Sequence, residues 1–328
     1  EISACLVGSE MCIRDRWSAF HTHYDTQMMP AKDPDRELVF KLHTFSSSLK
    51  LRLSSSSSWE HMAGWNMQIQ KNAIGGYSFL LPEYKRFTTG AFWLTTFRLD
   101  NQLSVTGGIR YDRGRIDIAA FEDPYLVEYL HRQGYEEEVI QAYRWRSYPV
   151  DRAYGNYSCS AGVVWTPAAG HLLKMNVGRS FRLPGVNELA SNGVHHGTFR
   201  HEKGDATLSS EQGWQIDASY TLAYKKMELV VSSFASWFDN YIYLRPMGEW
   251  SVLPHAGQIY QYSGARALFM GGEINFNMDF LRHFNYRLVG EYVYTYNRDE
   301  HTALSFSPPV SMLSLIHISE PTRQAEIS

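Results

Sequence analysis

Cysteine is scarce in this sequence, and what there is does not form a recognisable cluster. Only Cys5, Cys12 and Cys159 occur in 328 residues. No two of them stand at the close spacing of a thiolate metal site or a redox pair. Cys5 and Cys12 also fall in an end segment that we interpret below as adapter-derived. A disulfide framework and a cysteine metal cluster are therefore not expected.

Long apolar runs and a strong net charge are also lacking. No apolar stretch approaches the roughly 20 residues that a membrane helix needs. The formal net charge is only -3, so electrostatics gives no case for nucleic acid as a partner. The sequence also lacks a Gly-x-Ser-x-Gly elbow, a His-Glu-x-x-His pair and a phosphate loop. No spacing in the sequence supports an enzyme or a resident cofactor.

The two ends of the chain are related at the level of nucleotides. The tail, Leu313–Ser328, can be encoded by a DNA string whose reverse complement translates in frame as EISACLVGSEMCIRD, the head of the chain. That string resembles a transposase sequencing adapter followed by its index. We interpret residues 1–16 and 313–328 as adapter-derived and residues 17–312 as an internal piece of a longer gene. The alternative is a pair of natural termini that are complementary by chance.

Apolar and polar residues alternate through most of the chain. The stretches LSVTGGIRYD (Leu103–Asp112), GEINFNMDF (Gly272–Phe280) and NYRLVGEYVYTYN (Asn285–Asn297) all show this period of two. Such alternation predicts strands with one apolar and one polar face. The apolar face of these strands could pack inward in a soluble sandwich or face lipid in a membrane barrel.

Three features favour the membrane barrel. Several predicted strands run to ten residues or more, whereas strands in soluble proteins average about five or six. Their polar faces carry Arg, Glu, Asn and Asp, as a water-filled lumen allows, and aromatic residues, 14% of the chain, gather near strand ends as in interfacial girdles. We expect an all-β fold, a partial antiparallel transmembrane β-barrel of about eleven strands near residues 17–28, 37–56, 59–72, 88–99, 102–117, 154–167, 171–182, 211–224, 226–243, 259–279 and 284–299.

Connections of two lengths alternate along the predicted strands. Short turns are expected at Asp100-Asn101, Pro167–Gly170, Tyr224–Lys226 and Arg282-His283, and long polar segments at about 118–154, 182–211 and 244–258. In outer-membrane barrels the short turns are periplasmic and the long loops extracellular. Within the longest loop, Tyr135–Ile140 predicts a short surface helix, whereas the serine run Ser54–Ser58 is expected to continue a strand.

A more specific pattern lies in FRLPGVNELASNGVHHGTFRHEKGDATLSSE. A strand ends in Phe-Arg-x-Pro, an Asn-Glu-Leu element follows, and Gly-x-x-x-Leu-x-x-Glu opens the next strand. This pattern resembles the barrel of TonB-dependent outer-membrane receptors, and GGIRYD and SFASWFDNYIYL are weaker likenesses. The motif residues are Phe181, Arg182, Pro184, Asn187, Glu188, Leu189, Gly204, Leu208 and Glu211. Leu183 stands where the family commonly has Ala.

The resemblance implies a barrel of about 22 strands in the cell outer membrane, filled by an N-terminal plug domain. It also implies active uptake of a scarce solute, most simply a ferric siderophore, haem or a metal ion, with no covalent chemistry. The expected partners are outer-membrane lipid, the small solute and the TonB energy-coupling protein, which acts through an N-terminal region that is not in this chain. The alternatives are a passive porin-type barrel and, from another class, an outer-membrane hydrolase.

Histidines supply the candidate ligand contacts. His195 and His196, followed by His201 and Glu202, place imidazoles and a carboxylate in one long loop, and neutral imidazole binds zinc, copper, nickel or haem iron. We name His195 and His196 as a candidate metal pair; the alternative is a solvated polar loop. His21 and His23, also candidates, share one face of a predicted strand and could line a ligand path or simply belong to the lumen surface.

Two physical expectations accompany these assignments. Glu188 and Glu211 would be costly on a lipid face, so they should point to the lumen or to a polar loop junction, and Pro184 should stop strand pairing because it lacks an N–H. An open set of about eleven strands leaves unpaired N–H and C=O groups along both edges, each costing several kcal/mol in lipid. We expect a curved open sheet with the end segments at its periphery, which would not insert stably alone.

Overall fold

The computed structural model describes residues 6–20, 36–54, 56–195, 197–281, 284–305 and 307–318. A single fourteen-stranded sheet makes the wall of the molecule and includes two short loop strands, β10 (Asn192–His195) and β11 (Arg200–Lys203). The wall strands are β1 (Leu6–Phe20), β2 (Leu38–Ser54), β3 (Trp59–Gly75), β4 (Tyr84–Arg98), β5 (Leu103–Ile118), β8 (Val150–Trp165), β9 (His171–Arg182), β12 (Glu211–Tyr224), β13 (Met227–Trp250), β14 (Gln258–Leu281), β15 (Phe284–Asn297) and β16 (Ser311–Ile318).

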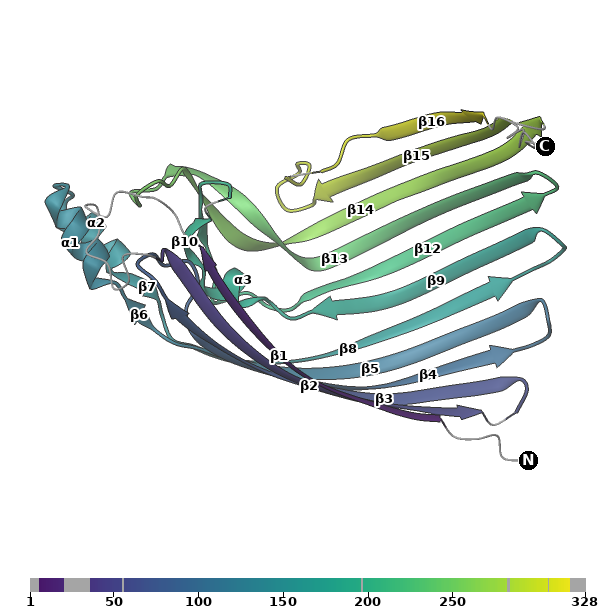
Figure 1. Cartoon of the computed structure of the whole chain (residues 1–328), viewed down its shortest axis with the longest axis horizontal. Coiled ribbons are helices and arrows are strands. Elements are labelled where there is room, and N and C mark those ends of the chain that lie inside the picture. The colour runs from purple at the N-terminus through teal and green to yellow at the C-terminus, as the bar shows by residue number, and fades with distance from the viewer. Residues whose placement is uncertain are drawn as a thin grey trace, which may run out of the picture.

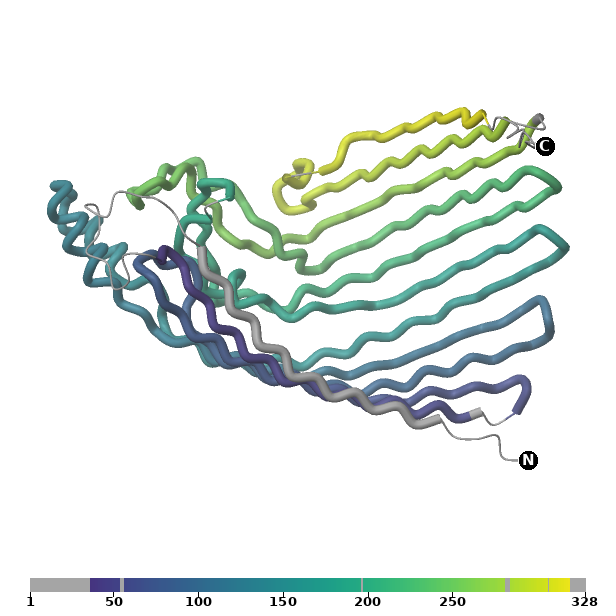
Figure 2. The backbone as a smooth tube through the Cα atoms, in the orientation of Figure 1, coloured from purple at the N-terminus to yellow at the C-terminus, as the bar shows by residue number. Residues whose placement is uncertain are grey.

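Each wall strand pairs antiparallel with its neighbour along the chain, and the sheet does not close within the described part of the molecule. β1 pairs with β2 and β16 pairs with β15, so these two strands form the edges. Figure 2 shows the resulting curved trough, in which β2 (purple) and β16 (yellow) lie apart. The predicted partial antiparallel barrel is confirmed. Every expected strand from 37–56 onward corresponds to an observed one.

The two edge strands extend into the end segments that we interpret as adapter-derived. Leu6–Arg16 pairs with β2 and Leu313–Ile318 with β15. Ladder hydrogen bonds join backbone groups, and an exposed sheet edge therefore pairs with almost any extended segment. The interpretation of residues 1–16 and 313–328 stays a prediction. Of the expected first strand, residues 17–20 belong to β1, and residues 21–28 lie outside the described residues.

Tight turns lie at one end of the strands and long loops at the other (Figure 1). At one turn, Asp100 Oδ1 accepts hydrogen bonds from the backbone N–H groups of Gln102 and Leu103, each at 2.7 Å. The expectation that Ser54–Ser58 continues a strand is wrong. β2 ends at Ser54, and the Ser56 hydroxyl accepts from the N–H of Trp59 at 3.1 Å, which makes a turn. The expected turn at Arg282-His283 lies outside the described residues.

The longest loop is more ordered than its sequence pattern indicated. It contains β6 (Phe121–Glu122), α1 (Pro124–Arg132), α2 (Glu137–Arg144) and β7 (Trp145–Ser147). The predicted helix at Tyr135–Ile140 overlaps α2. The start of α1 carries recognisable signals, since Asp123 accepts from the N–H of Leu126 at 3.1 Å and Pro124 opens the first turn.

The loop between β9 and β12 contains the third helix, α3 (Val186–Ala190), ahead of β10 and β11. Among the described helices, none combines the length and the apolar character that crossing a membrane requires. β13 is also longer than predicted, since it continues past residue 243 to Trp250.

The two faces of the wall differ as the alternation predicted. Tyr84, Ile116 and Tyr154 pack on a buried apolar cluster on the concave side, so the even-numbered residues of β4, β5 and β8 face inward. The outward positions carry exposed apolar and aromatic side chains: Trp93, Val105, Ile109, Tyr111, Tyr157, Val163 and Trp165. The concave face carries polar groups, among them Arg110, which donates to Asn66 Oδ1 at 2.6 Å and also pairs with Asp112.

Candidate functional site

The centre of the candidate site is an ion-pair network at the point where β9 leaves the wall. Nη1 of Arg182, the last residue of β9, donates to both carboxylate oxygens of Glu188, at 2.8 and 2.7 Å. Its Nη2 donates to Glu211 Oε2 at 2.9 Å, and its Nε to Glu211 Oε1 at 3.2 Å. Glu211 opens β12, the next wall strand, so one guanidinium joins the two strands and the loop between them.

Both carboxylates receive further hydrogen bonds. Glu188 Oε2 accepts from the N–H of Gly185 at 2.7 Å, and Glu211 Oε2 from the N–H of Ile242 at 3.0 Å. Glu188 is only 8% exposed, and a buried carboxylate is tolerated when a cation and N–H donors surround it. The sequence argument excluded both glutamates from the lipid face, and the structure places them at this polar junction.

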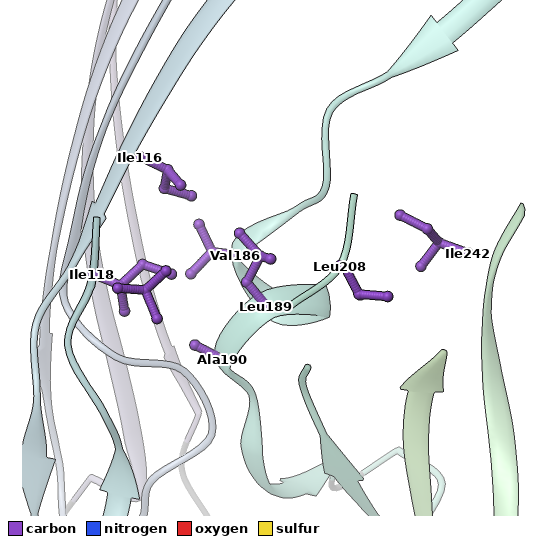
Figure 3. Close-up of a cluster of buried hydrophobic side chains, with 8 residues drawn as sticks. Ile116, Ile118, Val186, Leu189, Ala190, Leu208 and Ile242 are labelled. Carbon is purple, nitrogen blue, oxygen red and sulfur yellow. The ribbon is translucent and has the colours of Figure 1, made fainter. Parts of the chain in front are cut away.

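Helix α3 packs on the concave side of the wall rather than projecting into solvent. Figure 3 shows Val186, Leu189 and Ala190 between Ile116 and Ile118 of β5 and Ile242 of β13. Leu208 belongs to the same cluster. These contacts join distant parts of the wall across the loop, which fixes the helix in the interior of the trough.

Two close approaches explain further motif positions. A Cβ on Gly204 would lie 2.3 Å from the backbone nitrogen of Ala190, so only glycine fits there without a backbone shift. Pro184 is fully buried where β9 ends. Leu183, the departure from the family pattern, reaches Gly114 on β5, and a Cβ added there would lie 2.4 Å from Leu183 Cδ1.

A chain of hydrogen bonds links the helix to the loop strands above it. Asn187 Nδ2 donates to the Tyr262 hydroxyl at 3.0 Å, and this hydroxyl donates to Glu202 Oε2 at 3.3 Å. Phe181 is the remaining motif residue and lies within β9, opposite Gln212 of β12. The motif that the sequence singled out thus forms one connected unit at the junction of wall and loop.

Above this unit three loops share a second apolar cluster. Leu126 and Leu130 of α1, Ile140 of α2, Val194 of β10 and Leu253 of the β13–β14 loop are all buried together. The loops after β5, β9 and β13 are therefore held as one body, which we call the loop cluster.

His201 is part of the interior of the loop cluster. Its side chain is 0% exposed; Nδ1 lies 2.8 Å from the Ser251 hydroxyl and Nε2 lies 2.9 Å from Asn192 Oδ1. Burial, reinforced by the charges of Arg146 and Lys203, lowers the pKa of His201 to about 3. The ring is therefore neutral, and both its nitrogens are already engaged.

Of the other predicted histidines, His195 is the one that the structure describes, and it does not converge with His201. His195 ends β10, is exposed, and pairs with Arg200, whereas His201 pairs with Val194 in the next row. Successive rows of a ribbon alternate sides, so His195 and His201 point apart. His196, His21 and His23 lie outside the described residues. Within the ranges that the structure describes, no three His, Cys, Asp or Glu side chains are grouped so as to hold a metal ion.

Arg146 is a feature of the loop cluster that sequence reasoning did not anticipate. Only 2% of it is exposed, and its guanidinium lies 5.7 Å from the centre of the Phe79 ring and donates to the carbonyl oxygen of Asn192. Its Nε and Nη1 have no hydrogen-bond partner among the described residues. Burial lowers its pKa to about 10. The ammonium of Lys203 lies over the Tyr143 ring, 5.5 Å from the ring centre.

Three aromatic rings line the wall beside the ion-pair network. Phe238, Tyr241 and Phe269 lie with ring centres 4.9 to 5.3 Å apart. A Cβ on Gly213, two residues after Glu211, would lie 2.8 Å from the Phe238 ring, so glycine lets this ring lie flat on β12. The site therefore offers charged groups, hydrogen-bonding groups and aromatic surface.

Comparison with known proteins agrees with this architecture. Residues 14–312 match the family described as TonB dependent receptor-like, beta-barrel. Because that match covers most of the sequence, the chain belongs to the TonB-dependent receptor family. Members of this family are outer-membrane proteins, and this chain has the barrel-wall fold of the family, with its long loops at one end of the strands.

Solved structures show the same fold at low sequence identity. The copper transporter OprC aligns with a TM-score of 0.67 at 13% identity, over 97% of this chain and 48% of its own. The Serratia marcescens hemophore receptor HasR, solved with its hemophore HasA and heme, gives 0.57 at 20% identity over 78% and 42%. The ferric yersiniabactin uptake receptor FyuA from Yersinia pestis gives 0.58 at 9% identity over 97% and 45%. This chain spans less than half the length of these proteins. The comparison with curated proteins gives no match.

Proposed function

We propose that this chain is the barrel portion of an active importer that takes up a scarce solute, namely a ferric siderophore, haem or a metal ion. The observation that carries the proposal is the family match over residues 14–312. The inward-packed loop supports it, because the Arg182 network and the apolar contacts of α3 hold an ordered segment inside the trough. A receptor needs such a preorganised surface if binding is to cost little ordering.

The loop cluster supplies the surface on which the solute would first bind. Its exposed groups include His195 and the stacked pair Trp145 and Tyr148, with ring centres 6.2 Å apart. Aromatic faces and imidazole suit haem, a metal chelate or a copper ion. The similar structures named above are a copper transporter, a hemophore receptor in complex with its hemophore and heme, and a ferric yersiniabactin uptake receptor. Copper, haem and ferric siderophores are therefore the solutes to test.

The receptor would be energised by the TonB protein, acting on a part of the receptor outside this chain. The test is a deletion of the gene in its own host, with growth measured under limitation of iron, haem or copper in turn. We expect slow growth under one limitation, restored by the gene on a plasmid. A matched strain that lacks TonB separates active from passive uptake: growth equal to that of the parent strain would show a passive porin-type barrel and overturn the proposal.

A further inference from the structure

The outward face of the wall carries charge at only one end. In β2 to β5 and β8, the Lys, Arg, Asp and Glu residues at outward positions all lie near the long loops, within the part of these strands that the structure describes. The cations are Lys41, Lys71, Lys85, Arg113 and Arg115, and the anions are Asp117 and Asp151. We call the five cations the basic belt.

The strand register brings the belt residues together. Lys71 lies opposite Lys85 across the β3–β4 pair, and Lys85 opposite Asp117 across the β4–β5 pair. Arg113 and Arg115 follow each other on the outward face of β5. Like charges facing one another across a ladder are unfavourable. Asp117 can offset only one of the two facing lysines, so positive charge is left over for an anion from outside the sheet.

Most of the belt forms no ion pair within the part of the chain that the structure describes. Arg115 is the exception and binds Asp151, with its Nε 2.9 Å from Oδ1. Among the described residues, Lys41, Lys71, Lys85 and Arg113 make no side-chain hydrogen bond or ion pair. Positive charge therefore exceeds negative charge on this part of the outer surface.

The belt lies directly at the border of the apolar band. On β5 the outward positions from Leu103 to Tyr111 carry no charge, a nine-residue span that fits the 9 to 11 residues a tilted strand needs to cross a bilayer. Arg113 is the next outward residue, and Tyr111 and Tyr157 face each other just below it. This is the level at which aromatic girdles and lipid head groups meet.

A hollow at this border is shaped for a head group and the start of an acyl chain. It has a volume of about 390 Å³ and is lined by Phe87, Arg113, Arg115, Asp151 and Ala153, with Gly114. The small Ala153 and the ring of Phe87 give it an apolar wall. Above them the Arg113 guanidinium offers paired N–H donors, which match phosphate oxygens in geometry and charge, whereas the Arg115 guanidinium is bound by Asp151.

We propose that the basic belt binds the phosphate groups of lipid in the extracellular leaflet. Clusters of Lys and Arg beside a membrane attract anionic head groups, and the apolar wall of the hollow favours a lipid over free phosphate. The belt thereby fixes the depth and tilt of this side of the barrel, independently of the solute that the receptor carries.

The test compares lipid binding by the complete receptor that carries this chain. The purified receptor in detergent is titrated with diphosphorylated lipid A, and bound lipid is counted by native mass spectrometry. Lys71→Gln, Lys85→Gln and Arg113→Gln are combined in one variant. We expect its affinity for this lipid to fall on the order of 100-fold, because each basic residue near a charged lipid surface contributes severalfold.

Matched controls separate the belt from general charge and from folding. A variant with Lys174→Gln, Lys225→Gln and Lys226→Gln loses as many cations away from the belt and should bind like the unmodified receptor. A charge-preserving variant, Lys71→Arg, Lys85→Arg and Arg113→Lys, should also bind normally. Lipid A stripped of its phosphates should bind weakly to every form.

Three results would overturn the proposal. One is equal binding by the neutralised and unmodified receptors, and another is equal binding of lipid A with and without phosphates. The third is competition by inorganic phosphate at concentrations comparable to those of the lipid, which would identify a site for free phosphate instead.

Discussion

Both carboxylate oxygens of Glu188 lie within 2.8 Å of a single nitrogen of Arg182. The two residues are six positions apart, and the chain turns from a wall strand into an inward helix between them. The remaining guanidinium nitrogens bind Glu211, where the wall resumes. A loop of nearly thirty residues is thus anchored at both ends by one side chain.

Replacing Arg182 with Met should destabilise the receptor strongly. The Glu188 and Glu211 side chains, only 11% and 13% exposed, would lose their cation, but Arg182 itself is 45% exposed. We therefore expect a loss of roughly 2–3 kcal/mol, below the ~3–5 kcal/mol of a fully buried pair. The free energy of unfolding should be measured by urea titration in detergent. The matched control is Arg115→Met, since the Arg115–Asp151 pair is exposed (66% and 55%) and should contribute at most about 1 kcal/mol. Equal losses from the two substitutions would contradict the role assigned to Arg182.

Replacing Gly204 with Ala should disturb the inward loop, because the added methyl group would lie 2.3 Å from the backbone of Ala190. Backbone must then move, and we expect a loss of roughly 1–3 kcal/mol together with faster proteolysis between Arg182 and Glu211. Gly107→Ala is the control, since its methyl group would meet its nearest neighbour at 3.9 Å. Unchanged proteolysis in Gly204→Ala would show that the contact does not hold the loop.

Acid should loosen the loop cluster through His201. Its pKa is lowered from 6.5 to about 3 by burial, so the unfolded loop takes up a proton at a pH where the folded loop does not. The stabilising effect is complete above about pH 6.5 and decreases as the pH falls toward 3. Hydrogen exchange in β10 and β11 should accelerate across this window. In His201→Gln the pH dependence should be largely lost, whatever the variant's absolute stability; an unchanged pH profile would rule out His201 as its source.

His195 provides a test of the solute class. If the solute is haem or a metal ion, His195→Ala should raise the concentration for half-maximal uptake several-fold, because an exposed imidazole is a preferred ligand of both. His301→Ala, which removes an imidazole from another exposed loop, should have no effect. If a siderophore is the solute that relieves the growth defect, both variants should transport it normally. Loss of uptake in His301→Ala but not in His195→Ala would show that the solute contacts the loop of His301 instead of that of His195.

The sequence predicted the wall well because the wall depends on a local rule. A strand between lipid and water must alternate apolar and polar side chains. This alternation is visible in the sequences Leu103–Asp112 and Asn285–Asn297 without any tertiary information. The motif from Phe181 to Glu211 likewise identified the residues that meet at the junction. It did not show that Arg182 binds both glutamates, since that depends on how the loop folds back.

Contacts between loops could not be predicted from local patterns. His201 looks like a ligand in the sequence, yet Ser251 and Asn192 occupy its nitrogens because loops distant in sequence meet around it. Arg146 is buried for the same reason, and its burial does not follow from its neighbours in the sequence. The basic belt is also invisible in the sequence, where Lys71, Lys85 and Arg113 are scattered among ordinary charges.

The amino-acid sequence by itself determined the class of this protein, an all-β wall with one face for lipid and one for water, because side-chain alternation and backbone pairing act between near neighbours. The tertiary structure alone decided which side chains meet: the Arg182 network, the buried His201 and the outward belt. These depend on strand register and loop packing, which bring together residues far apart in the chain.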